Sequence, residues 1–322
     1  MAARPESRKR IAILGATSHI AKGLIHQFFL AQDAELYLFA RAPERVEAFL
    51  ESIGGGKEPT ILQLPFTEFP LHRYDAVINC VGIGSPSRLV QQPYAVFEIT
   101  EQFDQMVLAY LKEEPRTLYV SLSSGAAYGT DFSEPPGEKS QARFNANGMQ
   151  PTEYYGIAKL CSEAKHRALK ELNIVDLRVF GYFSRFINLD ESFLLSELVS
   201  CIKSGEEFVT GPHDLVRDFV HAEDLSALIR CLMREERIND VFDVYSAKPA
   251  GKFEIIETFA ASGVLKCRVA EQHAAVTATG TKSNYFSCNR RAERVGYHPR
   301  FTSIECIFQE TEALLGRALG GR

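Results

Sequence analysis

Hydrophobic and polar positions alternate in a regular order along the first half of the chain. Short apolar runs, typical of buried strands, are separated by longer stretches in which apolar residues recur at helical spacing. The predicted strands are Ile11–Leu14, Leu36–Phe39, Ile61–Leu64, Ala76–Val81, Thr117–Leu122 and Val175–Val179. The predicted helices are His19–Gln32, Glu44–Ser52, Val96–Lys112 and Tyr155–Leu172. Strands that alternate with helices pair in parallel, so we predict an α/β fold with a doubly wound parallel sheet.

The second half of the chain has a different pattern. The predicted helices Ser192–Lys203, Glu223–Arg234, Phe253–Ser262 and Ser303–Leu315 are interleaved with short strands at Phe208–Thr210 and Val241–Tyr245. This order does not repeat the regular alternation of the first half. It therefore predicts a smaller mixed α/β region that accompanies the large sheet.

Composition narrows the class of protein. The net charge of −5 over 322 residues gives no reason to expect a nucleic-acid surface. Seven scattered cysteines without a CxxC pair favour neither a zinc site nor a redox motif, so we expect no metal. Such thiols are typical of a reducing, cytoplasmic environment. No run approaches the roughly 18 apolar residues of a membrane span, so no membrane partner is expected.

The first predicted strand leads into a helix through a short loop that begins at Gly15. A strand, a tight turn and a helix N-terminus together form an anion site, because free backbone N–H groups point at a phosphate. Gly15 keeps the first glycine of a GxxGxxG pattern, and the small residues Ser18 and Ala21 occupy the other two positions. From the loop alone, a plain strand-to-helix turn is an equally good interpretation. In a Rossmann-type fold, the loop residues that contact a dinucleotide are Gly15, Thr17, Ser18, His19 and Ile20.

The residue after the second strand bears on the choice of cofactor. A carboxylate there favours NAD, whereas this chain has Arg41 followed by Arg45. A guanidinium pairs well with a 2′-phosphate, so NADP is favoured, with NAD possible. The alternative interpretation of Arg41 is a solvated surface arginine.

A tyrosine and a lysine four residues apart form the candidate catalytic pair. Tyr155 and Lys159 lie on one face of a predicted helix. An ammonium group beside a phenol favours the phenolate, which can take a proton from a substrate hydroxyl while hydride leaves. Upstream, Ser124 ends a predicted central strand, where its hydroxyl can hydrogen-bond the reacting oxygen. Ser123 is the adjacent alternative.

With these motifs assembled, the chain resembles the extended short-chain dehydrogenase/reductase family, especially its NAD(P)-dependent nucleotide-sugar epimerase/dehydratase branch. The segment from Ser123 to Gly129 is similar to the family's Ser-Ser-x-x-x-Tyr-Gly stretch, which precedes the YxxxK helix. The resemblance implies that Ser124 is the hydroxyl partner, Tyr155 the acid/base and Lys159 its helper. Lys159 and Tyr155 are then also cofactor contacts.

The resemblance implies further contacts outside the catalytic group. Asn79 and Val81 are similar to the end of the family's fourth strand, beside the cofactor. Arg217 begins a stretch similar to the family's RDF(V/I)HVxD motif, whose arginine contacts the diphosphate of a nucleotide sugar. Substrate contacts are therefore expected at Ser85, Ser124 and Arg217. A structural ion pair of Arg217 with a neighbouring aspartate is the alternative.

The chain departs from the family pattern in three places. Family dehydratases carry an acidic pair after the catalytic hydroxyl, and here Gly125 and Ala126 have no proton-transfer capacity, which disfavours a 4,6-dehydratase. Gly181 replaces the asparagine that commonly follows the LRxF stretch. The segment 278–281 replaces an Arg-x-Gly-Asp clamp.

The leading hypothesis is an NAD(P)-dependent oxidoreductase/epimerase that acts on a nucleotide-linked sugar by reversible hydride transfer at a carbinol carbon. Under this hypothesis the activity is that of a 4-epimerase or a 4-ketoreductase, and both alternatives are kept. The alternatives are a reductase of a small non-nucleotide carbonyl compound and a non-catalytic NADP-sensing or scaffold protein. We expect residues 1–177, with roughly 214–247, to form the NAD(P)-binding Rossmann domain, and 178–213 and 248–322 to form the substrate-binding region. The resemblance also implies a homodimer.

Overall fold

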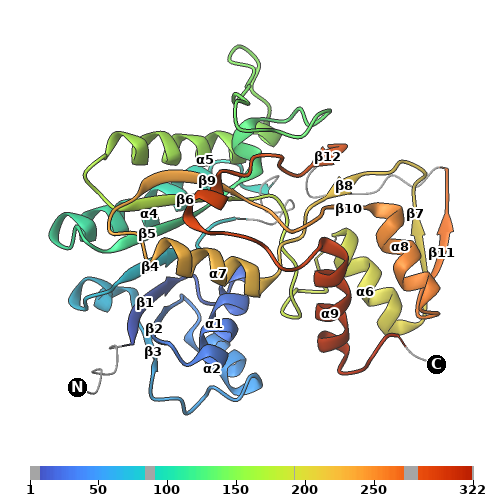
Figure 1. The fold of residues 1–322 in the computed structure, drawn as a ribbon, viewed down its shortest axis with the longest axis horizontal. Helices are drawn as coiled ribbons and strands as arrows, with labels where there is room; N and C mark the ends of the chain where they lie inside the picture. Colours follow the sequence, from blue (N-terminus) through green and yellow to red (C-terminus); the bar gives the residue numbers. More distant parts are fainter. Residues whose placement is uncertain (1–7, 84–90, 192, 272–281, 321–322) are drawn as a thin grey trace.

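The large sheet has seven parallel strands. The computed structural model describes residues 8–83, 91–191, 193–271 and 282–320. The strand order is β3-β2-β1-β4-β5-β6-β9 (Figure 1), and every neighbouring pair is parallel. The strands are β1 (Lys9–Leu14), β2 (Ala34–Phe39), β3 (Ile61–Leu64), β4 (Ala76–Asn79), β5 (Leu118–Ser124), β6 (Ile174–Val179) and β9 (Asn239–Val244). The predicted α/β fold of the Rossmann type is therefore confirmed.

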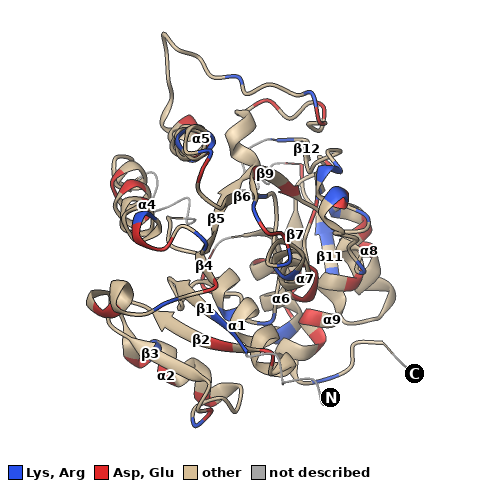
Figure 2. Cartoon of the chain, turned by 60° about the vertical axis from the view of Figure 1, so that its left-hand side comes forward, with Lys and Arg blue, Asp and Glu red and all other residues tan. Residues whose placement is uncertain are grey.

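Helices cover both faces of this sheet. They are α1 (His19–Ala31), α2 (Pro43–Ser52), α4 (Ala95–Glu113), α5 (Pro151–Ala168) and α7 (Ala222–Leu232). Helices α4 and α5 pack against each other on one side, and α1 and α7 pack against each other on the opposite side (Figure 2). Parallel strands buried on both faces need this double cover, because each face is apolar.

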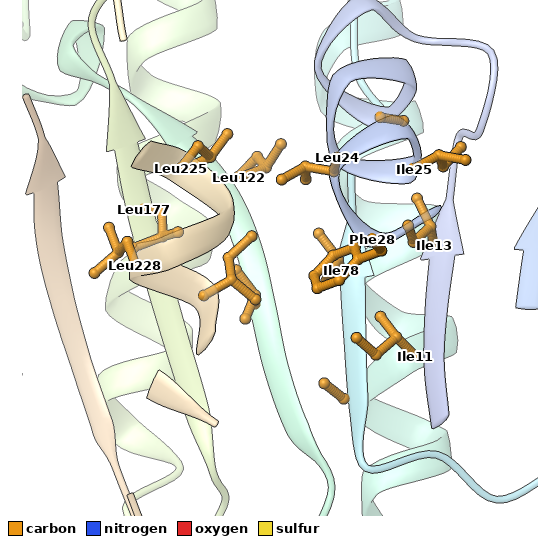
Figure 3. Packing of buried hydrophobic residues seen from close by; sticks show 14 of the residues in the cluster. Ile11, Ile13, Leu24, Ile25, Phe28, Ile78, Leu122, Leu177, Leu225 and Leu228 are labelled. Carbon is orange, nitrogen blue, oxygen red and sulfur yellow. The ribbon is translucent and has the colours of Figure 1, made fainter. Parts of the chain in front are cut away.

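The side chains of β1 show how the two faces are divided. Ile11 and Ile13 belong to the core under α1, α2 and α7, where they pack with Leu24 and Phe28 (Figure 3). Ala12 and Leu14 point to the other face, into the core that includes residues of α4. Alternate residues of a strand face opposite sides, so one short apolar run supplies both cores.

The second half of the chain adds a smaller group of elements. Helices α6 (Leu194–Ser204), α8 (Lys252–Ala261) and α9 (Ser303–Leu315) share a core of their own. They lie beside two small sheets (Figure 1), which contain the strands β7 (Glu207–Thr210), β8 (Val216–Arg217), β10 (Ala250–Gly251), β11 (Lys266–Val269) and β12 (Asn284–Tyr285). The short strands β8, β10, β11 and β12 have no counterpart in the sequence prediction. The division into domains stays a prediction.

Both predicted boundaries of α5 were wrong by about one turn. The helix begins at Pro151, not at Tyr155, because the N–H of Gln150 donates to the Glu153 carboxylate at 2.7 Å and closes a capping box. It ends at Ala168, not at Leu172. Just after Ala168, the N–H of Leu169 donates to the carbonyl of His166. Tyr155 therefore lies inside the second turn of the helix, where its position is fixed.

Two findings concern what the described part of the chain lacks. No helix in it combines the length and apolar content needed to cross a membrane. Within the same ranges, no group of three His, Cys, Asp or Glu side chains is arranged to hold a metal ion.

Candidate active site

The candidate site lies at the carboxyl edge of the large sheet. In the strand register Leu14 is opposite Asn79, Asn79 is opposite Ser121, and Ser124 is opposite Val179. Because the strands are parallel, the loops that follow them open at one edge. Strand β2 pairs with β1 on one side, and β4 pairs with β1 on the other. A crevice therefore forms between the loop after β1 and the loop after β4. Doubly wound sheets bind ligands at such a point.

Gly15 brings the two loops of this crevice together. Its φ of 76° is in the left-handed region, and its N–H donates to the carbonyl of Phe39 at 2.9 Å. A Cβ at this position would lie 3.1 Å from the backbone carbonyl of Cys80 and from the side chain of Val81. A glycine is therefore needed here, both to adopt the left-handed backbone conformation and to leave room for Cys80 and Val81. The result is a close backbone cradle at the N-terminus of α1, which fits the diphosphate of a dinucleotide.

The other loop residues have more varied roles. Thr17, Ser18, His19 and Ile20 are each partly exposed beside Gly15. The Oγ of Ser18 caps α1 by accepting from the N–H of Ala21 at 3.3 Å. The Nε2 of His19 lies 3.3 Å from the carbonyl of Ser184, and burial lowers the pKa of His19 to about 4. At neutral pH, His19 is thus an uncharged link between this loop and the segment after β6.

Positively charged side chains gather beside the end of β2. Arg41, just after β2, and Arg45, in the first turn of α2, are both exposed. Lys22, on α1, is close enough to Arg45 to be affected by it: burial, followed by repulsion from Arg45, lowers the pKa of the Lys22 ammonium. Lys22 was not among the predicted contacts. Its position one turn beyond the Gly15 loop is the signal that could have identified it.

Asn79 fixes the loop after β4. Its side-chain oxygen accepts from the N–H of Val81 at 3.0 Å, and its amide donates to the hydroxyl of Tyr119 at 3.1 Å. Tyr119 in turn donates to Asp104 on α4 at 3.0 Å. The structure therefore brings Asn79 and Val81 to the crevice, with Asn79 as the anchor that shapes the loop.

Lys159 is on α5, and its side chain extends towards β5 and the residues just after β4. Its Nζ donates to the carbonyl of Leu122 at 2.8 Å and lies 5.8 Å from the centre of the Tyr155 ring. A Cβ on Gly82 would lie 3.9 Å from the same Nζ. The predicted pair is thus brought together, with the buried ammonium facing the loop that closes the crevice.

Ser124 and its neighbour Ser123 take different partners. The Oγ of Ser124 lies 3.1 Å from the hydroxyl of Tyr285, and it also accepts from the N–H of Ala126 at 3.2 Å. The hydroxyl of Ser123 instead donates to the carboxylate of Glu163, at 2.5 Å, in the packing between β5 and α5. The geometry therefore favours Ser124 over Ser123 as the hydroxyl that faces the site.

Tyr285 is a site residue that the sequence analysis missed. It comes from β12, far along the chain, and is buried against Phe132 and Phe180 with ring-centre distances of 4.8 and 5.2 Å. Burial raises the pKa of the Tyr285 phenol, and the nearby Tyr155 phenol adds to that increase. The Tyr285 hydroxyl therefore stays protonated. No motif around Tyr285 indicates this role, because the contact depends on tertiary structure.

Two of the glycines that depart from the family pattern are required by close packing. A Cβ on Gly125 would lie 2.4 Å from the ring of Phe180, so an aromatic ring occupies the space of a longer side chain. A Cβ on Gly181 would lie 2.4 Å from the carbonyl oxygen of Asp218. Neither position can accept an acid or an amide without movement of its neighbours.

Arg217 lies near Tyr285. It is buried on β8, donates to the carbonyl of Val216 at 2.8 Å, and its Cζ is 5.9 Å from the centre of the Tyr285 ring. Burial lowers the pKa of Arg217 to about 10. The carboxylate of Asp218 accepts from Ser246 and Ser303. Ser85 and the segment 278–281 lie outside the described residues.

Comparisons with solved structures agree with this architecture. A 4-epimerase of UDP-N-acetylglucosamine from Methanobrevibacter ruminantium M1, in complex with UDP-N-acetylmuramic acid, has a TM-score of 0.78 at 16% identity. The match covers 96% of this chain and 99% of that one. A UDP-glucose-4-epimerase from Stenotrophomonas maltophila, with bound NAD and formylated UDP-arabinopyranose, has a TM-score of 0.78 at 18% identity, with 96% and 98% covered.

A dehydratase has nearly the same fold. The dTDP-glucose 4,6-dehydratase from Bacillus anthracis str. Ames, in complex with NAD, has a TM-score of 0.75 at 13% identity, over 94% of this chain and 96% of that one. No curated protein matches the sequence. The family model described as "NAD dependent epimerase/dehydratase family" matches residues 11–246, which contain the Gly15 loop, Ser124, Tyr155 and Lys159. The chain therefore belongs to the NAD dependent epimerase/dehydratase family.

Proposed function

We propose that the chain catalyses reversible hydride transfer at a carbinol carbon of a nucleotide-linked sugar, as an NAD(P)-dependent 4-epimerase or 4-ketoreductase. The observation that carries the proposal is the arrangement of Ser124, Tyr155 and Lys159 at the carboxyl edge of the sheet, beside the Gly15 cradle. A hydroxyl, a phenol and an ammonium at this edge are the groups that an alcohol oxidation or a ketone reduction requires.

Each residue has a separate task in this reaction. Tyr155 takes the proton from the substrate hydroxyl, or returns it to the new alkoxide in the reverse direction. Lys159, 5.8 Å from the Tyr155 ring, stabilises negative charge on the phenol oxygen. Ser124 donates to the reacting oxygen and stabilises its developing charge. A bound nicotinamide dinucleotide supplies the carbon that exchanges hydride with the substrate.

The packing at Gly125 argues against a dehydratase activity. Elimination of water needs a proton-transfer group next to the catalytic hydroxyl. Here the ring of Phe180 fills the space beyond Gly125, and Ala126 has no titratable atom. The fold shared with a dehydratase does not alter this, because activity depends on the site residues.

We propose NADP as the preferred cofactor, with NAD possible. The support is the group of cations formed by Arg41, Arg45 and Lys22 on the adenosine side of the crevice. The 2′-phosphate of NADP is a dianion that can pair with these cations, whereas the ribose hydroxyl of NAD at the same position is uncharged.

We further propose that residues 178–213 and 248–322 form the substrate-binding region and that 1–177 with roughly 214–247 bind the cofactor. The support is that Tyr285, on β12, contacts Ser124 from outside the large sheet. We also propose that the enzyme acts as a homodimer.

Turnover of a panel of UDP-, GDP-, CDP- and dTDP-sugars, with NADP(H) and NAD(H), tests the proposal. We expect Tyr155→Phe to abolish turnover and to leave cofactor affinity unchanged, and Tyr154→Phe to behave like the wild type. Turnover that survives Tyr155→Phe would exclude the mechanism. Reduction of small carbonyl compounds without turnover of any nucleotide sugar would support the alternative reductase. Cofactor binding without any turnover would support a sensor or scaffold.

A further inference from the structure

A row of polar side chains crosses three strands at the carboxyl edge of the large sheet. In the strand register Ser123 of β5 is opposite Arg178 of β6, and Arg178 is opposite Asp243 of β9. Side chains at paired positions of neighbouring parallel strands point to the same face of the sheet. The three residues therefore lie side by side on one face, where Glu163 of α5 contacts Ser123 and Arg178.

Arg178 lies between two buried carboxylates in this row. Its Nε donates to the carboxylate of Glu163 at 3.0 Å, and its Nη1 lies 3.6 Å from Oδ1 of Asp243. Asp243 is 1% exposed, and burial raises the pKa of its carboxyl group, whereas the charge of Arg178 lowers it. The group formed by Arg178, Glu163 and Asp243 has one positive and two negative side chains. The Asp243 carboxylate therefore needs further hydrogen-bond donors.

Two hydroxyl groups from separate loops supply those donors. The hydroxyl of Ser287 donates to Oδ2 of Asp243 at 2.6 Å, and the hydroxyl of Tyr128 donates to the same oxygen at 2.9 Å. Burial raises the pKa of Tyr128 to about 12, so its phenol keeps the proton that it donates. One carboxylate oxygen thus joins the loop that contains Tyr128 to the loop that contains Ser287.

Each of these loops carries one member of the Ser124–Tyr285 pair. Tyr128 ends the short 3₁₀ helix η2 (Gly125–Tyr128), which begins directly after Ser124 and is capped by its Oγ. Ser287 is fully buried and comes two residues after Tyr285. Strand β12 pairs with β8 at two positions. A contact just beyond so short a strand therefore helps to fix where Tyr285 lies.

We propose that Asp243 is a positioning residue for the Ser124–Tyr285 pair. Its carboxylate binds the loop of each member at once, through the hydroxyls of Tyr128 and Ser287. A carboxylate suits this task because it accepts several hydrogen bonds, and because bonds to a charged acceptor are stronger than those between neutral groups. The inference rests on the proposed function, in which Ser124 donates to the reacting oxygen.

A purely structural role for Asp243 leads to different expectations. If the carboxylate only stabilises the fold, loss of one of its partners lowers the melting temperature and leaves the Tyr285 ring in place. If the carboxylate positions Tyr285, loss of the Ser287 hydroxyl moves that ring. The effect on turnover then depends on the Tyr285 hydroxyl being present.

Nuclear magnetic resonance of the full chain with ¹³C-labelled tyrosine rings tests the proposal without turnover. The chain has 12 tyrosines, and the signal that is missing in Tyr285→Phe identifies Tyr285. We expect this signal to shift in Ser287→Ala and in Asp243→Asn, which keeps the size of the side chain and removes its charge. Ser226→Ala removes a buried hydroxyl on α7 and is the matched control, in which the Tyr285 signal should stay in place.

A double-mutant cycle then tests whether the effect on turnover passes through Tyr285. We expect Ser287→Ala to lower kcat about threefold in the wild type and to have no further effect in Tyr285→Phe, with KM unchanged in both. An unmoved Tyr285 signal in Ser287→Ala, or an equal fall of kcat in both backgrounds, would overturn the proposal. If no nucleotide sugar is turned over, the proposed function fails, whereas the resonance comparison still tests the role of Asp243.

Discussion

The hydroxyl of Ser124 lies 3.1 Å from the hydroxyl of Tyr285, although 161 residues separate them in the chain. Ser124 ends a central strand of the large sheet, and Tyr285 belongs to one of the small sheets. A serine that donates to a reacting oxygen needs a donor for its own lone pairs, and the neutral phenol of Tyr285 can supply it. In the proposed mechanism, Tyr285 is thus a positioning residue for Ser124.

Removal of the Tyr285 hydroxyl tests this relationship. Tyr285→Phe keeps the ring that packs on Phe132 and Phe180 and removes only the contact with Ser124. We expect kcat to fall about fivefold, which corresponds to the loss of one hydrogen bond of about 1 kcal/mol, with KM and cofactor affinity little changed. Steady-state kinetics and cofactor titration measure these quantities. A fall in melting temperature with unchanged kcat would mean that the hydroxyl has only a structural role.

The space at Gly125 gives a second prediction. Gly125→Ala places a methyl group 2.4 Å from the ring of Phe180, which is itself held between Phe132 and Tyr285. We expect a loss of about 1–3 kcal/mol in the free energy of unfolding, measured by urea denaturation. Gly137→Ala is the matched control, because nothing lies within 4 Å of its Cβ position. Equal stability of the two variants would contradict the packing described here.

The environment of the buried His166 side chain leads us to expect that stability depends on pH. It is fully buried, and although burial alone would lower its pKa, hydrogen bonds to Asp104 and Asp176 raise the pKa to about 9. Because the folded pKa exceeds the ordinary value of 6.5, the stabilisation is complete below pH 6.5 and is lost as the pH rises to about 9.

We expect the free energy of unfolding to fall by on the order of 3 kcal/mol over this interval. Urea denaturation at several pH values measures the change. In His166→Asn the same interval should show a much smaller slope, since the titrating group is gone. Parallel slopes for wild type and variant would rule out His166 as the source.

Substitution of Arg41 is expected to change the cofactor preference. Arg41→Asp removes a cation that we assign to the 2′-phosphate and introduces a carboxylate that repels it. We expect the affinity for NADP to fall at least tenfold relative to that for NAD, as measured by fluorescence titration of both cofactors. Arg234→Asp, at an exposed position just after α7, controls for the change of net charge. An unaltered preference for NADP would remove Arg41 from the cofactor site.

Sequence patterns predicted the sheet, and they located most of the candidate site, for a physical reason. Buried parallel strands are short apolar runs, and Gly15, Asn79 and Ser124 directly follow or end such runs, so their positions are locally encoded. The spacing of Tyr155 and Lys159 likewise identified one helical face, even though the start of the helix was misjudged.

The parts of the site that were missed depend on contacts between distant segments. Tyr285 lies on a two-residue strand, which is too short for a period of hydrophobic residues to be read. The choice of Ser124 over Ser123 depends on Glu163, which reaches Ser123 from another element. Such contacts are visible only when the chain is folded.

The close approach of Gly181 to the Asp218 carbonyl has a consequence for protein engineering. The asparagine that the family resemblance leads one to expect at this position cannot be introduced by one substitution, because its Cβ would lie 2.4 Å from that oxygen. The strand β8 and the start of α7 would have to be exchanged together with it. Position 181 and the Arg217–Val220 segment are therefore expected to vary as one unit, and chimeras that divide them should fold poorly.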